Sequence, residues 1–274
     1  MRRPFALLML LLSFSVAQAQ PNGLLVYNAW VRPTAPALVD GATPEAPLPG
    51  TVTGAFMMIV NTSDADYQLV SVADDFAELS QIHQMTLDSK GIMRMHAVES
   101  VDIPAGQTVT LGSAGYHVML MNVAHDLYPS QAVALTLTLS DSSGAIFTVP
   151  VGALTTDEPP ADDPLIVANA LAQTDDQALD VSLILDNRGA QADTLTGASS
   201  DVAKTVTLVE HGNPARSLDT LDVPPQAQTT LSPDGVFIRL TDLTQPPSEA
   251  FVLMLSFKSG KTVTVAVPLL GVGS

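Results

Sequence analysis

The sequence predicts an all-β protein in which one antiparallel sandwich or barrel domain occurs twice. Short apolar segments of strand length recur between turn-forming residues, which is typical of antiparallel sheets. No convincing amphipathic helical pattern is present. The second half of the chain repeats sequence patterns of the first half, which indicates a duplicated fold.

The N-terminal segment, residues 1–19, is expected to be a secretory signal peptide. Arg2 and Arg3 precede an apolar run at residues 5–16, and the small-residue cleavage pattern at residues 17–19 follows it. The run is too short to span a bilayer comfortably, which argues against a permanent anchor. We therefore expect a secreted chain, in the periplasm or another extracytoplasmic part of the cell envelope, without stable membrane insertion after cleavage.

Composition excludes several classes of protein. The 274 residues include no cysteine, which rules out a lipid-anchored cysteine, a disulfide framework, a thiol redox enzyme and a thiolate metal site. The formal net charge is −17, so the chain repels the phosphates of nucleic acids, and no nucleic-acid partner is expected. The acidity mainly indicates a well-solvated surface.

The first domain is expected at residues 20–155. A first strand is predicted at residues 24–31, and a Pro- and Ala-rich loop follows at residues 32–49. A second, buried strand is predicted at residues 54–61. Further short strands are expected up to residues 147–151.

An acidic, Pro-rich linker is predicted at residues 156–164, and a second domain is expected at residues 165–274. The second domain opens with residues 165–171, which match residues 24–30. Because further segments match in the same order, we expect one fold to occur twice. The further matches pair residues 183–187 with 58–61, 221–224 with 101–104, and 235–240 with 115–120.

The strand predicted at residues 115–121 carries the clearest chemical signal. Side chains alternate between the two faces of a strand, so His117, Met119 and Met121 share one face. In the second half, Arg239 takes the position of Met119. Because Arg is almost never fully buried unless it is paired, this face is expected to be partly exposed.

Two other short pieces repeat this residue chemistry. If both are extended, His83 shares a face with Met85, and Met93 shares a face with Met95. Thioether sulfur is a soft ligand that suits Cu(I), and imidazole binds copper in general. The alternative is that the Met side chains fill a core, which is a common use of this adaptable residue.

The spacing of these residues resembles the His-(Met)-x10-Met-x21-His-x-Met signature of the PCu(A)C copper chaperones. The resemblance covers residues 24–154 and implies a cupredoxin-like, immunoglobulin-like β-sandwich that binds Cu(I) outside the cytoplasm. The ligands it implies are His83, Met95, His117 and Met119. Neutral imidazole and thioether ligands suit a carrier, because they hold Cu(I) less tightly than thiolates do.

Some residues depart from the signature or lie beside it. Gln84 replaces the optional Met, and the insertion between residues 32 and 54 is longer than usual for the family. The Met/His-rich C-terminal tail of some members is absent. Possible auxiliary sulfurs are Met85, Met93 and Met121; the alternative for them is packing at the rim of the site.

The second domain is predicted to have lost the metal ligands. The position of Met95 falls on Ala215 or Ser217, depending on a gap. We expect this degenerate copy to dock a partner, shield the site or stabilise the first domain. Val209, Phe237 and Arg239 take the places of His83, His117 and Met119.

The resemblance implies an exported copper(I) chaperone that binds one Cu(I). Its implied partners are a copper acceptor such as a cytochrome c oxidase subunit, through the CuA centre, or a Sco-type protein. No enzyme is expected, because no catalytic motif stands out and a blue-copper site would need a cysteine. The alternatives are copper sequestration and a structural or adhesive role without metal.

Overall fold

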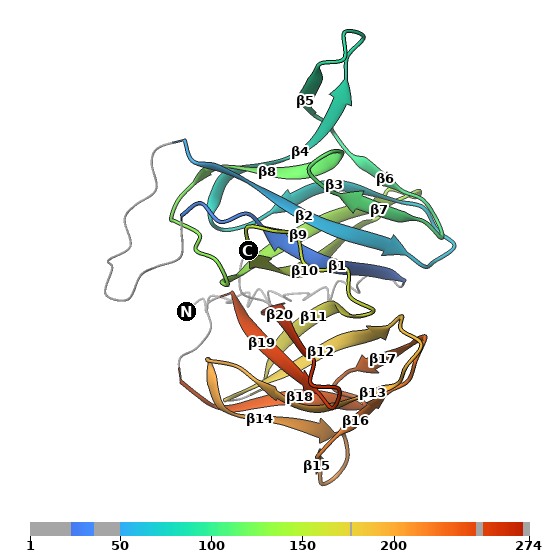
Figure 1. Ribbon diagram of the computed structural model, residues 1–274, viewed down its shortest axis with the longest axis vertical. Helices are drawn as coiled ribbons and strands as arrows, with labels where there is room; N and C mark the ends of the chain where they lie inside the picture. The colour runs from blue at the N-terminus through green and yellow to red at the C-terminus, as the bar shows by residue number, and fades with distance from the viewer. Residues whose placement is uncertain (1–22, 36–49, 176, 245–248, 271–274) are drawn as a thin grey trace, which may run out of the picture.

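The computed structural model contains strands, turns and irregular loops, and no helix occurs among the residues it describes. Figure 1 shows two β-structured lobes, the first formed by the blue-to-green half of the chain and the second by the yellow-to-red half. The predicted all-β class is confirmed. The described residues are 23–35, 50–175, 177–244 and 249–270.

Two expectations concern segments outside this part of the chain. The signal peptide expected at residues 1–19 lies wholly outside the described residues, as do residues 36–49 of the predicted loop. Within the described ranges, no helix is long and apolar enough to cross a membrane.

The first lobe packs two layers of strands around one apolar core. One layer runs β1-β2-β7-β8-β4-β5, and the other runs β6-β3-β9-β10. Leu69, Leu120 and Leu137, which come from both layers, are completely buried between them. The strands are β1 (Leu24–Val31), β2 (Val52–Asn61), β3 (Tyr67–Ala73), β4 (Ala77–Leu87), β5 (Met93–Ala97), β6 (Val101–Ile103), β7 (Thr108–Leu111), β8 (Tyr116–Val123), β9 (Ala132–Asp141) and β10 (Ile146–Thr155).

The second lobe has its own core, to which Leu183, Ile238 and Leu253 contribute. One layer runs β11-β12-β18-β14-β15, with β17 also paired to β12, and the other runs β16-β13-β19-β20. The strands are β11 (Leu165–Asp175), β12 (Ala178–Asn187), β13 (Asp193–Ser199), β14 (Ala203–Glu210), β15 (Arg216–Leu218), β16 (Leu221–Val223), β17 (Ala227–Leu231), β18 (Val236–Leu243), β19 (Ala250–Phe257) and β20 (Thr262–Pro268).

The two lobes share one strand topology. β4 pairs with β5 and β8, and correspondingly β14 pairs with β15 and β18. β3 pairs with β6 and β9, and β13 pairs with β16 and β19. Left-handed backbone also recurs at matching points, because φ is 49° at Asn28 and 50° at Asn169. Asn adopts this conformation more readily than most residues.

Pairing is antiparallel, as predicted, with local exceptions. In the first lobe β1 runs parallel to β10, with Trp30 opposite Leu154, and β7 meets β8 in parallel at one position. A parallel bridge between Ala172 and Leu269 is the counterpart of the first exception in the second lobe. The first and last strands of each lobe are not joined by a hairpin, so nothing forces them to run in opposite directions.

The lobes meet edge to edge where β1 pairs with β11. Tyr27 lies opposite Ala168 in this pairing, and Leu25 and Ile166 complete a small buried cluster. The Tyr27 hydroxyl donates a hydrogen bond to Asp186 Oδ2 at 2.9 Å. Burial, together with this neighbouring carboxylate, raises the pKa of Tyr27 to about 12.

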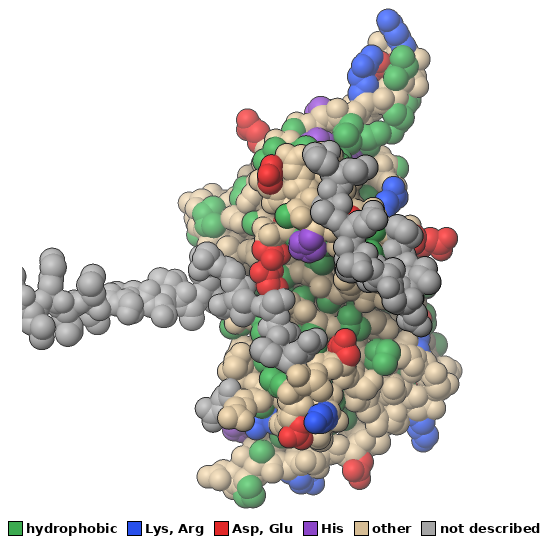
Figure 2. Space-filling view, turned by 90° about the vertical axis from the view of Figure 1, so that its left-hand side faces the viewer, with side chains coloured by type: hydrophobic (Ala, Val, Ile, Leu, Met, Phe, Trp, Pro, Cys, Tyr) green, Lys and Arg blue, Asp and Glu red, His purple; other side chains and the backbone are tan. Residues whose placement is uncertain are grey.

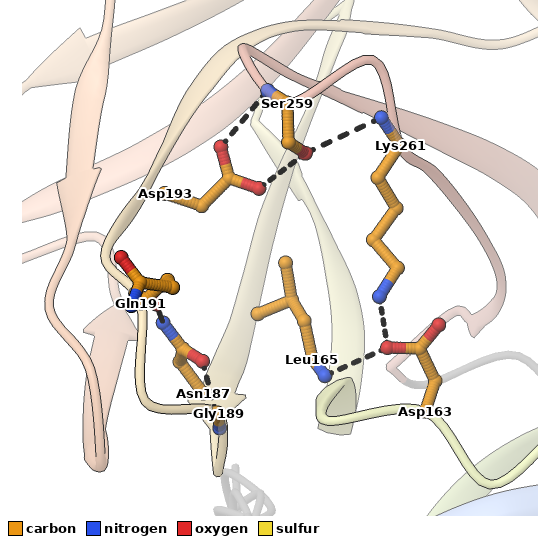
Figure 3. A network of polar contacts seen from close by, with 8 residues as sticks. All are labelled: Asp163, Leu165, Asn187, Gly189, Gln191, Asp193, Ser259 and Lys261. Carbon is orange, nitrogen blue, oxygen red and sulfur yellow. Dashed lines mark hydrogen bonds and ion pairs between the residues drawn. The ribbon is translucent and has the colours of Figure 1, made fainter.

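The predicted linker, residues 156–164, contains no strand and leads from β10 to β11. Its end is fastened to the second lobe (Figure 3), because Asp163 accepts a hydrogen bond from the Leu165 backbone at 2.8 Å and pairs with Lys261 Nζ. The linker is therefore held in place at its C-terminal end.

The turn after β12 is built on the buried Asn187, which Figure 3 also shows. Its amide nitrogen donates to the Gln191 carbonyl at 2.9 Å, and its oxygen accepts from the Gly189 backbone at 3.0 Å. Asn61 makes the matching bonds in the first lobe, to the Ala65 carbonyl at 2.7 Å and from the Ser63 backbone at 3.0 Å. Both lobes therefore satisfy a buried amide in the same way.

Candidate metal centre

The ends of β4 and β5 form a hairpin, the arm (residues 85–97), which extends beyond the first lobe (Figure 1). Among the described strands β5 pairs only with β4, and all five residues of β5 are exposed. Figure 2 shows Lys and Arg side chains at the tip of the arm and His side chains at its base. The basic residues of this segment are Lys90 and Arg94, and Arg94 forms an ion pair with Asp88 at 2.9 Å.

Strand register brings the sequence-predicted residues onto one face of the sheet. His83 lies directly opposite His117 across β4 and β8, and Met85 lies opposite Met95 across β4 and β5. Residues opposite each other share a face, and so do residues two apart on one strand. The shared face carries His83 and Met85 from β4, Met93 and Met95 from β5, and His117, Met119 and Met121 from β8.

His117 on this face is only 5% exposed. Its ring stacks on Phe56 with 6.4 Å between centroids, and Phe56 stacks on Trp30 at 4.3 Å. Gly54 leaves room for the Phe56 ring, because a Cβ atom at residue 54 would come within 2.9 Å of Phe56 Cζ. The Phe56 ring therefore packs beside the imidazole of His117.

The hydrogen bonds of His117 determine which ring nitrogen is available. Nδ1 lies 3.3 Å from the Gly115 carbonyl oxygen, and Nε2 lies 3.2 Å from Met95 Sδ. A carbonyl oxygen only accepts, so the single N–H of the neutral ring is assigned to Nδ1. The Nε2 lone pair then faces the thioether sulfur, and both atoms are electron donors.

His83 lies beside His117, with 6.1 Å between the ring centroids. Its Nδ1 is buried and has no hydrogen-bond partner among the described residues, whereas Nε2 lies 3.2 Å from Gln81 Oε1. Burial lowers the pKa of His83, and repulsion from His117 and His96 adds to the effect. The ring is therefore held in the neutral form, which is the form that binds metals.

The Met side chains on this face differ in their exposure. Met119 is partly exposed and lies opposite Gly54 on one side and Gln81 on the other. Met95 and Met93 on the arm are each 48% exposed. The Met side chains are therefore exposed as expected for a partly exposed face, whereas His117 on the same face is buried.

The donor set is soft and contains no carboxylate. Within the described part of the chain, no three His, Cys, Asp or Glu side chains are grouped so that they could hold a metal ion. What the face offers instead is two neighbouring imidazoles, one of them in contact with the Met95 sulfur, and further Met side chains on the same face. This combination suits Cu(I) and is a poor match for oxygen-preferring ions such as Mg²⁺ or Ca²⁺. The buried Nδ1 of His83, which has no partner among the described residues, is an atom that a bound ion would satisfy.

The second lobe carries different chemistry on the same face. Val209 lies opposite Phe237, as His83 lies opposite His117. Arg239 donates to both carboxylate oxygens of Asp180, at 2.7 and 2.6 Å, and to Asp175 at 2.6 Å. In the second lobe this part of the face therefore offers apolar side chains and an ion pair in place of soft ligands.

The register also decides between the two candidates for the position of Met95. Ser217 lies opposite Val209, as Ala97 lies opposite His83. Two residues before Ala97 is Met95, and two residues before Ser217 is Ala215, which immediately precedes β15. Ala215 therefore takes the position of Met95 in the second lobe.

Sequence reasoning missed three residues of the site. Gln81 contacts His83, Phe56 supports His117, and Gly54 leaves space for Phe56. The available signal for Gln81 was strand alternation, because a residue two places before His83 must share its face. Phe56 and Gly54 lie far from the motif in sequence and carried no comparable signal.

Comparisons with known proteins give a family. The family model described as "LpqE-like: Putative lipoprotein LpqE-like" matches residues 24–151 and 164–269. Putative lipoprotein Lxx21020 of Leifsonia xyli subsp. xyli (strain CTCB07) is 28% identical over 132 residues, which are 48% of this chain and 71% of that protein.

Several solved structures are partly similar. The copper-bound PCuAC domain from PmoF2 is 19% identical, with a TM-score of 0.35, over 40% of this chain and 95% of that domain. The apo PCuAC domain from PmoF1 is 21% identical, with a TM-score of 0.35, over 50% and 95%. CuI-DR1885 from Deinococcus radiodurans is 22% identical, with a TM-score of 0.33, over 36% and 74%. The copper mentioned in these names was bound to those proteins.

Proposed function

The chain belongs to the LpqE-like family, and from that premise we propose that it is an exported chaperone that binds one Cu(I) in its first domain. The ligands of this proposal are His83, Met95, His117 and Met119. Met85, Met93 and Met121 are auxiliary sulfurs on the same face.

The contact between His117 and Met95 is the observation that carries the proposal. Nε2 and Sδ are 3.2 Å apart, with the ring proton assigned to the opposite nitrogen. Two facing lone pairs gain little from each other, whereas a soft cation binds both. The buried Nδ1 of His83, which has no partner among the described residues, adds another donor on the neighbouring ring, whose centroid lies 6.1 Å from that of His117.

The exposure of the ligands supports a carrier rather than a permanent metal site. Met95 is 48% exposed on the arm, whereas His117 is 5% exposed within the lobe. An incoming ligand from an acceptor therefore has access at Met95 while the imidazoles still hold the ion. Neutral ligands also bind Cu(I) less tightly than thiolates, which favours release. A carrier role of this kind requires no catalysed reaction.

The acceptor and the location rest on the sequence resemblance. We propose delivery to a copper-requiring protein such as a cytochrome c oxidase subunit or a Sco-type protein, in the periplasm or elsewhere in the cell envelope. The family is described as lipoproteins, but none of the 274 residues is cysteine, so none of them carries a cysteine-linked lipid.

The second domain, in this proposal, is a metal-free copy that stabilises the first. The shared topology and the edge-to-edge pairing of β1 with β11 support this role. The proposed boundaries are residues 20–155 and 165–274, joined by the linker at residues 156–164.

A Cu(I) competition titration with a chromogenic chelator, under anaerobic conditions, tests the binding proposal. We expect one Cu(I) per wild-type chain and loss of tight binding in His117→Ala. Phe237→Ala is the matched control in the second lobe and should bind as the wild type does. Wild-type protein that cannot compete with the chelator, or a His117→Ala variant that competes equally well, would overturn the assignment. Mixing the loaded protein with an apo CuA domain then separates delivery from sequestration.

A further inference from the structure

The two imidazoles of the candidate metal centre are oriented by different oxygen atoms. The Gly115 carbonyl lies 3.3 Å from Nδ1 of His117, and the Gln81 side-chain oxygen lies 3.2 Å from Nε2 of His83. Each neutral ring has one N–H group, and an oxygen acceptor fixes it on the nitrogen that it contacts. The two rings therefore offer different nitrogens: Nε2 in His117 and Nδ1 in His83.

The burial of Nδ1 affects which tautomer of His83 is more stable. Nδ1 is buried without a hydrogen-bond partner among the described residues, so a proton on this nitrogen would be buried and unsatisfied. Leaving a buried donor unsatisfied costs about 1–3 kcal/mol. In the other tautomer, Nε2–H donates to Gln81 Oε1 and Nδ1 keeps a free lone pair. The contact with Gln81 and the burial of Nδ1 thus favour the same tautomer.

We propose that Gln81 is a positioning residue, which holds His83 in the Nε2–H tautomer so that Nδ1 is the nitrogen presented to copper. This inference rests on the proposed copper function for its consequence, although the tautomer itself is a property of the metal-free protein. Metal-binding His residues commonly donate their second N–H to an oxygen, and loss of that partner typically costs about 10–100-fold in metal affinity.

The second lobe shows that the fold does not require Gln at this position. Thr207 lies opposite Arg239, as Gln81 lies opposite Met119. Its hydroxyl lies 3.5 Å from the Arg239 backbone oxygen, and the strand carries Val209 where β4 carries His83. Where the imidazole is absent, the amide is absent as well.

The orienting groups also differ in how they can be altered. The acceptor for His117 is a backbone carbonyl, which a side-chain substitution leaves in place. The acceptor for His83 is the side chain of Gln81, so a single substitution removes it without touching a proposed ligand. This difference makes the inference testable on the whole 274-residue chain.

The first test reads the tautomer in the absence of metal. We propose nitrogen-15 NMR of the imidazole rings in the copper-free protein at pH 8, for wild type and Gln81→Leu. Wild-type His83 should show protonated Nε2 and unprotonated Nδ1. In Gln81→Leu the population of the Nδ1–H tautomer should rise measurably, although the burial of Nδ1 still opposes it. An unchanged Nε2–H tautomer in Gln81→Leu, or an Nδ1–H tautomer in the wild type, would overturn the proposal.

The second test measures Cu(I) affinity with a chelator of known affinity, again at pH 8. Gln81→Leu should bind Cu(I) about 10–100-fold more weakly than wild type. Gln81→Glu keeps an oxygen acceptor and should restore most of the loss. Gln84→Leu is the matched control, because Gln84 lies on the opposite face of β4 and should have no effect. Equal losses in Gln81→Leu and Gln84→Leu would show a general disturbance of the strand and contradict a positioning role.

The two tests separate this inference from the proposed function. If wild-type protein binds no Cu(I), the copper proposal fails, and the NMR measurement still decides whether Gln81 holds the ring. If wild type binds Cu(I) and Gln81→Leu matches it in both tautomer and affinity, only the role of Gln81 is overturned.

Discussion

The same face of the same fold carries His and Met side chains in the first lobe and an ion pair in the second. His117 and Met119 on β8 correspond to Phe237 and Arg239 on β18, which pair in the same register. Because the second lobe folds around its own core without the His and Met side chains, the fold does not need them. The residues that distinguish the first lobe are therefore best explained by function.

The residues opposite Met119 and Arg239 complete this contrast. Gly54 lies opposite Met119, whereas Asp180 lies opposite Arg239. A side chain at residue 54 would collide with Phe56, which supports His117. In the second lobe the Asp180 carboxylate neutralises the guanidinium. The first lobe thus leaves its donors available, and the second lobe satisfies its charges internally.

Removal of His117 should give the largest effect. His117→Ala should weaken Cu(I) binding by more than about 100-fold, the upper range for loss of a supporting residue, because a ligand itself is lost. Phe237→Ala at the same position of the second lobe should leave affinity unchanged. The measurement is an anaerobic competition titration. Equal losses in the two variants would remove the functional distinction between the lobes.

Acidification should weaken Cu(I) binding by more than tenfold between pH 7 and 5, since only neutral imidazole binds and an ordinary His has a pKa of about 6.5. The pKa of His83 is lowered, so its ring stays neutral to a pH below the ordinary pKa of His. Its contribution to Cu(I) binding should therefore be lost only at that lower pH. We expect nearly constant affinity above neutrality and release approaching two protons per Cu(I) bound in the acidic range.

A series of competition titrations between pH 5 and 8, with a chelator whose own protonation is known, checks this. An affinity that does not vary with pH would mean that His83 and His117 are not ligands. His117→Met should bind more weakly at neutral pH and lose less on acidification.

Replacement of Arg239 should lower the stability of the protein and leave Cu(I) binding unchanged. Arg239→Met leaves Asp180, whose side chain is 10% exposed, without its main partner. The expected loss in the free energy of unfolding is about 1–3 kcal/mol, because a buried acceptor becomes unsatisfied. Cu(I) affinity should not change. Denaturant unfolding and a copper titration on the same sample test both statements, and a weakened copper site would show that the lobes are energetically coupled.

Removal of the sulfur on the arm should have a moderate effect. Met95→Ala should weaken Cu(I) binding by about tenfold, which is 1.4 kcal/mol, and barely change the free energy of unfolding, because Met95 is 48% exposed. Met119→Ala should also weaken binding with little change in folding. Competition titrations and thermal melts distinguish the outcomes. A loss of about 2–5 kcal/mol in stability would identify these Met residues as core packing.

The smallest effect is expected where the lobes meet. Tyr27→Phe removes the hydrogen bond to Asp186, which keeps its ion pair with Arg188 at 2.9 Å. The expected loss is about 1 kcal/mol in the free energy of unfolding, with Cu(I) affinity unchanged. Denaturant unfolding measures the first quantity. A clear loss of affinity would mean that the contact between the lobes also shapes the copper site.

The sequence alone determined the all-β class and the side-chain pattern of each strand. Alternation along a strand has a period of two and depends only on local sequence. It therefore placed His117 with Met119, His83 with Met85, and Met93 with Met95, and the spacing of the motif indicated copper. The alignment of the two halves likewise predicted that Arg239 takes the position of Met119 in the second lobe.

The tertiary structure decided how those pieces meet and which atoms they present. Cross-strand register put His83 opposite His117, the stacking of Phe56 buried the His117 ring, and contacts with Gly115 and Gln81 selected the available nitrogens. These features depend on partners from other strands or on the exact direction of a side chain. Local periodicity predicts neither the partner strand nor the side-chain direction. It assigns a residue to a face and does not specify what that residue contacts.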